Sequence, residues 1–168
     1  MSDFFKDTLA NGLRVLTVPM PHLHAVEMMF FVGVGSRNEK SRVAGVSHFL
    51  EHMLFRGCED YRTGPELERA FEAIGGYVNA ATDVETTCYH SRVHPDHVDR
   101  GTALFAQMLQ APLMHDFETE RRVILEEALE DLNAKGEDVN PDNLTAALLW
   151  PGHPLGRPTI GTRASIEG

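Results

Sequence analysis

The spacing of hydrophobic positions changes several times along the chain, and each change marks a different expected element. An Asn11-Gly12 turn, followed by alternating apolar and polar residues at 13–18, predicts a hairpin whose second strand is half-buried. The short apolar run at residues 25–34 is rich in Met, Phe and Val, and it predicts a strand that is buried on both faces.

Helical spacing starts at residue 45, where apolar side chains recur every three or four residues as far as residue 55. Ser41 or Ser47 is the expected N-cap of this helix, and Gly57 lies where a C-terminal glycine belongs. Further helices are predicted at residues 63–74, 96–109 (capped by Asp96), 117–132 and 143–150, with one or two strands at 77–93. Because these strands and helices mix without a strict βαβ alternation, the expected fold class is α+β.

Composition narrows the class of protein. The 168 residues hold 15 Lys and Arg against 25 Asp and Glu, a net charge of −10, and so acidic a chain is not expected to bind nucleic acid. No apolar stretch approaches the ~18 residues of a membrane span, and residues 1–7 lack the features of a secretory signal. Two cysteines cannot cross-link a fold of this size, so the sequence predicts a cytoplasmic protein. The length of 168 residues predicts one domain, or a piece of a larger one.

Two of the nine histidines stand in the motif His48-Phe49-Leu50-Glu51-His52. On a helix, His48 and His52 lie on one face about 6 Å apart along the axis, where both imidazoles can reach one zinc ion. Glu51 flanks this face and is the candidate general base, because a carboxylate near a metal-activated water can take its proton. Two helical histidines also occur as hydrogen-bonded core residues, so a metal site requires a third ligand.

The predicted helix at residues 117–132 offers carboxylates as that third ligand. With ~100° of rotation per residue, Glu120, Glu127 and Asp131 fall in a narrow stripe at the border of its apolar face. Glu126 falls toward the polar side. A carboxylate that meets a buried metal should lie on the border, which favours Glu127 or Glu120 over Glu126 and leaves the choice between the border residues open.

Four longer segments extend these motifs. They are residues 45–57 (GVSHFLEHMLFRG), 75–82 (GGYVNAAT) followed by 85–89 (ETTCY), 118–127 (ETERRVILEE) and 153–162 (HPLGRPTIGT). In this order they resemble the zinc helix, the substrate strand, the third-ligand helix and the closing loop of the pitrilysin family. That family of zinc peptidases carries an inverted H-x-x-E-H motif and includes insulin-degrading enzyme and the mitochondrial processing peptidase. The resemblance spans essentially the whole chain and is strongest to the bacterial members of the processing-peptidase type.

The resemblance implies a role for each matching residue of the predicted zinc site. His48, His52 and Glu127 would bind Zn²⁺, and Glu51 would be the general base. Glu120 would be a carboxylate next to the ligands that orients them and supports their basicity. The implied activity is that of a zinc metalloendopeptidase, which hydrolyses peptides or unfolded segments.

The resemblance also implies a fold and a mode of substrate binding. The fold would be a two-layer α+β half-domain with a mixed, mainly antiparallel sheet that is covered on one face by helices. Asn79 and Ala80 would lie on an edge strand that binds the peptide substrate as an added strand. Family chains carry two or more half-domains around a chamber. Residues 1–168 are therefore expected to form an N-terminal zinc-binding half-domain that is incomplete at its C-terminal end and needs a second half-domain or a partner subunit.

Two other functions fit parts of the sequence. Some members of the family have lost ligands and serve as non-catalytic subunits; the complete set of candidate residues argues against this, although a fragment can bind metal and still cleave nothing. S-ribosylhomocysteine lyase shares a related fold and an H-x-x-E-H helix but uses cysteine as its third ligand. Neither Cys58 nor Cys88 lies in the segment of the candidate carboxylates.

Overall fold

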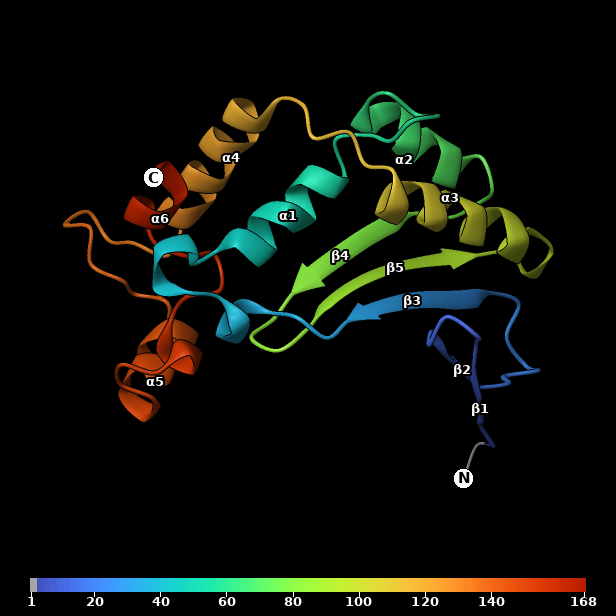
Figure 1. Cartoon of the computed structure of the whole chain (residues 1–168), viewed down its shortest axis with the longest axis horizontal. Coiled ribbons are helices and arrows are strands. Elements are labelled where there is room, and N and C mark those ends of the chain that lie inside the picture. Colours follow the sequence, from blue (N-terminus) through green and yellow to red (C-terminus); the bar gives the residue numbers. More distant parts are fainter. Residues whose placement is uncertain (1–2) are drawn as a thin grey trace.

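The computed structural model describes residues 3–168 and has two layers, a three-stranded antiparallel sheet and a set of helices on one of its faces (Figure 1). The sheet has the order β3-β5-β4, formed by β3 (Val26–Val32), β5 (Thr87–Val93) and β4 (Val78–Thr82). The helices on that face are α1 (Val46–Leu54), α2 (Gly64–Glu72), α3 (Val98–Gln110) and α4 (Phe117–Leu129). The expected α+β class, with an antiparallel sheet under helices, is confirmed.

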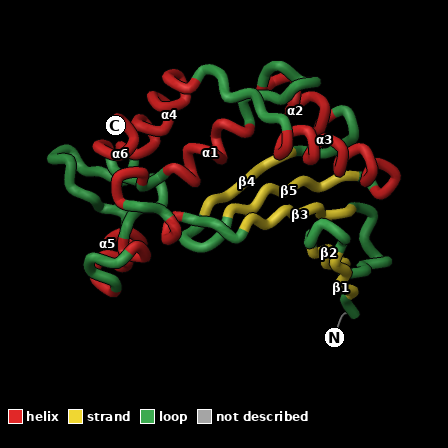
Figure 2. The backbone as a smooth tube through the Cα atoms, viewed as in Figure 1, coloured by secondary structure: helices red, strands yellow, loops and turns green. Residues whose placement is uncertain are grey.

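Smaller elements surround this frame (Figure 2). They are the hairpin β1 (Phe5–Thr8) and β2 (Arg14–Thr17), the helices α5 (Pro141–Leu149) and α6 (Arg163–Glu167), and 3₁₀ turns at Ser36–Asn38, Ser41–Val43, Pro95–His97 and Pro154–Gly156. Met1 and Ser2, which belong to the segment used for the signal-sequence prediction, lie outside the described residues. Within residues 3–168, none of the helices has both the length and the apolar character needed to cross a membrane.

The main core lies between the inner face of the sheet and helices α2 and α3. Phe105 of α3 is fully buried, and its ring lies 4.6 Å from that of Phe30 on β3 and 5.2 Å from that of Phe71 on α2, measured between centroids. Phe71 is also fully buried, and so are Leu67, Val93, Leu104 and Met108. Because these rings come from β3, α2 and α3, the cluster joins the sheet to the helices. Aromatic pairs at these distances add to the free energy gained by burial.

Truncation of Phe105 is expected to destabilise the fold strongly. Phe105→Ala removes a buried ring that contacts both layers, and the free energy of unfolding should fall by about 3–5 kcal/mol. Phe31→Ala is the matched control because the Phe31 side chain is 64% exposed, and it should cost less than about 1 kcal/mol. Urea unfolding followed by circular dichroism measures both values, and equal losses would contradict the assignment of the core.

Two predictions of burial are wrong. Strand β3 is buried on one face only: Met28 and Phe30 pack against the core, whereas Met29 and Phe31 on the opposite face are exposed. A continuous apolar run does not reveal whether one or both faces of a strand are covered. Among residues 3–168, the helices cover only the inner face of the sheet. Strand β2 pairs with β1 as predicted, but it is exposed along its whole length instead of half-buried.

Several ends of elements also differ from the prediction. Helix α3 begins at Val98 after a 3₁₀ turn, so Asp96 does not cap it, whereas residues 77–93 form two strands, one of the two predicted alternatives. Helix α4 ends at Leu129, three residues early. Helix α5 begins two residues early, because the side chain of Asn140 accepts the N–H groups at the start of this helix.

Candidate metal centre

Helices α1 and α4 lie side by side, and their packing sets the geometry of the site (Figure 1). Phe49 and Met53 of α1 pack with Ile124 of α4 and Ile166 of α6 in a second buried cluster. Because His48 and His52 flank Phe49 on α1, and Glu127 lies one turn beyond Ile124 on α4, this packing turns their polar side chains toward each other.

Three of the predicted ligands converge between the two helices. Nε2 of His48 lies 3.6 Å from Oε1 of Glu127, and Nε2 of His52 lies 3.5 Å from Oε2 of the same carboxylate. The donor atoms that these three residues offer all lie within 4.8 Å of one another. The structure therefore brings together two imidazole nitrogens and one carboxylate, donated by both helices.

This spacing fits a zinc ion. Zinc bonds to imidazole and carboxylate donors are about 2.0–2.2 Å long, and tetrahedral coordination then separates neighbouring donor atoms by roughly 3.3–3.6 Å. The two separations between histidine nitrogen and carboxylate oxygen, 3.6 and 3.5 Å, lie in or at the edge of this interval. Two imidazoles and one carboxylate are also a donor set of catalytic zinc sites, which keep one position open.

Burial shifts the pKa values of two of these residues. Burial, followed by the nearby His52, lowers the pKa of His48 from its ordinary value, which keeps its imidazole neutral. Burial raises the pKa of Glu127 against the opposing effect of His52. A neutral imidazole has the free lone pair that a metal requires, and the carboxyl of Glu127 binds a metal in its ionised form.

Glu120 holds His52 from the other side of its ring. The Glu120 side chain is buried, and its Oε1 lies 2.8 Å from Nδ1 of His52. Because a carboxylate is an acceptor, this contact makes Nδ1 the protonated nitrogen and leaves the Nε2 lone pair facing Glu127. Arg56 lies 3.3 Å from Oε2 of Glu120 and also donates to Asp116, so it links the end of α1 to the start of α4.

Glu51 contacts the edge strand of the sheet and is not one of the three converging donors. The hydroxyl of Thr82, at the end of β4, donates a hydrogen bond to Oε2 of Glu51. Burial, and next the charge of Glu51, raises the pKa of Tyr89 to about 12, so this phenol remains protonated. The carboxylate of Glu51 thus lies next to the site with one oxygen held by Thr82.

Asn79 and Ala80 lie on β4, which is an edge strand of the three-stranded sheet. Asn79 is exposed, and its Oδ1 accepts the N–H of Ala80 at 2.8 Å. Because Thr82 of the same strand contacts Glu51, the edge of β4 runs toward the site.

The sequence pattern does not reveal three residues near the site, which are Glu39, Arg56 and Thr82. The predicted N-cap of α1 is wrong. Neither Ser41 nor Ser47 caps α1: the helix begins after Gly45, and the carboxylate of Glu39 accepts N–H groups there. Arg56 and Thr82 were also missed, because their partners lie 64 and 31 residues away in the sequence and local spacing carries no signal of such pairs.

Known proteins resemble this chain in sequence. A family model described as insulinase (peptidase family M16) matches residues 14–163. An uncharacterized zinc protease of Mycobacterium leprae (strain TN) is 40% identical over 165 residues, which cover 96% of this chain and 36% of that protein. The uncharacterized zinc protease YmxG of Bacillus subtilis (strain 168) is 32% identical over 161 residues, which cover 95% of this chain and 39% of that protein.

Solved structures share the fold. A protease from Helicobacter pylori superposes with a TM-score of 0.85 at 26% identity, over 100% of this chain and 40% of that chain. Pitrilysin superposes with a TM-score of 0.78 at 24% identity, over 98% of this chain and 18% of that chain, a similarity that concerns the fold alone. The chain spans about two fifths of the length of the curated relatives it matches.

Proposed function

Because the chain belongs to the insulinase family, peptidase family M16, we propose that it forms the zinc-binding catalytic region of a metalloendopeptidase. One observation carries this proposal: the donor atoms of His48, His52 and Glu127 lie within 4.8 Å of one another, with spacings that suit zinc. The relatives that are named zinc proteases support zinc as the ion.

Glu51 is the proposed general base. A zinc ion held by His48, His52 and Glu127 would polarise the scissile carbonyl and lower the pKa of water. Glu51 Oε2 accepts the hydroxyl of Thr82, which fixes the carboxylate and leaves Oε1 available to take a proton from water. The same oxygen then returns the proton to the leaving amine.

Glu120 is proposed to act through His52. Its hydrogen bond to Nδ1 fixes the orientation and tautomer of the ring, and a carboxylate partner of this kind raises the basicity of the ligand nitrogen. Arg56 in turn keeps the second oxygen of Glu120 in a fixed position. Glu120 contributes to catalysis by holding a ligand, and it contacts neither substrate nor water in this proposal.

The peptide is proposed to bind as an added strand along β4. The strand has a free edge in the described sheet, and its last residue, Thr82, contacts the proposed base. A substrate carbonyl that pairs with the N–H of Ala80 replaces the amide oxygen of Asn79, so this N–H is satisfied before and after binding. Backbone pairing of this kind gives affinity with little preference for side chains.

A second half-domain or a partner subunit is proposed to complete the enzyme. The relatives are more than twice as long as the matched segment, and so is the solved Helicobacter pylori protease. The same observation favours an alternative function, in which the 168-residue chain binds zinc and cleaves only when joined to the other half.

Zinc content and peptide cleavage test the proposed function together. The purified chain, stripped by a chelator and reloaded with zinc, is expected to retain one zinc per chain after dialysis. A longer polypeptide that includes the chain is expected to cleave an unstructured fluorogenic peptide and to lose this activity on chelation. Absence of zinc after loading rejects the metal site. Zinc without cleavage in both proteins rejects the enzyme and supports a non-catalytic subunit.

A further inference from the structure

A buried carboxylate lies at the start of helix α1, close to His48. Glu39 is 9% exposed; its Oε2 accepts the N–H of Gly45 and its Oε1 accepts the N–H of Ser47, both at 2.7 Å. These N–H groups belong to the four at a helix start that have no partner inside the helix. The negative charge also lies at the positive end of the helix dipole. Glu39 therefore uses both of its oxygens to define where α1 begins.

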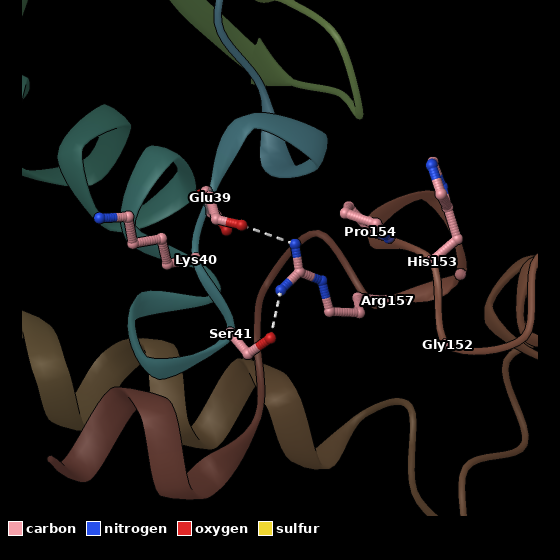
Figure 3. Close-up of a pocket in the computed structure, with 8 residues that line it drawn as sticks. Glu39, Lys40, Ser41, Gly152, His153, Pro154 and Arg157 are labelled. Atoms are coloured by element: carbon pink, nitrogen blue, oxygen red, sulfur yellow. Dashed lines mark hydrogen bonds between the residues drawn. The ribbon is translucent and has the colours of Figure 1, made fainter.

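Arg157 anchors the segment that carries Glu39 (Figure 3). Its Nη2 donates to the backbone oxygen of Glu39 at 2.7 Å, and its Nη1 donates to the hydroxyl of Ser41 at 3.1 Å. The guanidinium borders an open cavity of about 580 Å³ between this segment and the loop at 152–157. The two hydrogen bonds of Arg157 therefore join the two segments beside this cavity.

The backbone at residues 160–161, just after this loop, is in direct contact with the start of α1. Gly45 and Gly161 both have φ of +91°, a conformation that disfavours other residues. A Cβ atom on Gly45 would lie 2.2 Å from the carbonyl oxygen of Ile160, and one on Gly161 would lie 2.4 Å from that of Ala44. The loop and the helix start therefore form one closely packed unit.

From these contacts we infer that Glu39 is a positioning residue of the metal site and that Arg157 anchors it from 118 residues away in the sequence. His48 lies in the first turn of α1, so any shift of the helix start displaces this imidazole before it displaces His52. The inference rests on the proposed function and extends it: the loop around Arg157 sets the position of a zinc ligand that it does not touch.

Glu39→Gln tests the inference most directly. Glutamine keeps one acceptor oxygen and places an NH₂ group against the second N–H, so the two bonds cannot both form. We expect the zinc affinity, measured by competition with a chromophoric chelator, to fall about 10-fold or more. The visible absorption spectrum of the cobalt-substituted chain should also change, because it reports the geometry of the donors. Arg157→Ala should act in the same direction with a smaller effect.

Thr63→Ala is the matched control. It removes the side-chain cap of α2, a helix that carries no residue of the site, so it should lower stability and leave zinc affinity and the cobalt spectrum unchanged. Hydrogen exchange of the metal-free chain gives a second measurement: Glu39→Gln should speed exchange in the first turn of α1, and Thr63→Ala should not.

The outcomes separate this inference from the proposed function. If the unmodified chain binds one zinc and Glu39→Gln binds it with equal affinity and an unchanged cobalt spectrum, the positioning role is rejected and the zinc site stands. If Thr63→Ala weakens zinc binding as much as Glu39→Gln does, the effect is one of general stability, and the positioning role is again rejected. If the unmodified chain binds no zinc, both proposals fail.

Discussion

Glu51→Gln is expected to reduce peptide hydrolysis by about 10²–10⁴-fold while the protein keeps one zinc per chain. The amide cannot take a proton from water, but it has nearly the same shape and can still accept the hydroxyl of Thr82. Because Glu51 lies outside the group formed by His48, His52 and Glu127, its replacement leaves the three donors unchanged. The measurement is kcat/KM on a fluorogenic peptide for the longer polypeptide that includes the chain, with metal analysis of the same sample.

The control for this variant is Glu68→Gln, which removes one negative charge from an exposed position of α2. It should leave both hydrolysis and zinc content unchanged. Loss of zinc in Glu51→Gln would show that this carboxylate is a ligand and would overturn its assignment as the base. Full activity would remove it from the reaction altogether.

The features predicted correctly from the sequence are those that depend on neighbouring residues. The helix that carries His48 and His52 follows from apolar spacing, and α2 follows from a proline in its first turn after Thr63, which caps it as the structure shows. The hairpin likewise follows from the Asn11-Gly12 turn. In each case a few adjacent residues determine the backbone conformation.

The features that were missed depend on contacts between distant segments. The cap of α1 comes from Glu39, six residues before Gly45, and this separation matches no standard capping pattern. Arg157, near the other end of the chain, donates a hydrogen bond to the backbone oxygen of Glu39. The wrong prediction for β3 has a similar cause. Its apolar run is consistent with one or two covered faces, and only the packing of other elements decides which face is covered.

The structure separates two carboxylates that the sequence pattern leaves equivalent. Glu120 and Glu127 lie on the same border of α4, seven residues apart, so helical geometry alone does not assign them. In the folded chain Glu120 is buried against Nδ1 of His52, whereas Glu127 faces the Nε2 atoms of both histidines. The two positions suit different roles, one behind a candidate ligand and one among the candidate ligands.

Glu127→Gln is therefore expected to weaken zinc binding by more than about 100-fold, so that the variant loses its zinc during dialysis. Loss of a partner behind a ligand costs roughly 10–100-fold in metal affinity, and loss of a charged ligand costs more. The substitution removes the only carboxylate among the three converging donors of the described residues. Glutamine has nearly the same shape as glutamate, so the packing of the side chain on α4 is nearly preserved. Metal analysis after dialysis and competition with a chelator measure the effect.

Glu126→Gln is the matched control, because it makes the same chemical change one residue earlier on an exposed face of α4. It should keep one zinc per chain with unchanged affinity. Thermal unfolding of the metal-free proteins separates ligand loss from misfolding: both variants should unfold at nearly the same temperature, and only Glu127→Gln should fail to gain stability when zinc is added. Zinc-dependent stabilisation of Glu127→Gln equal to that of the unmodified chain would exclude Glu127 as a ligand and leave Glu120 as the remaining border carboxylate in contact with a site histidine.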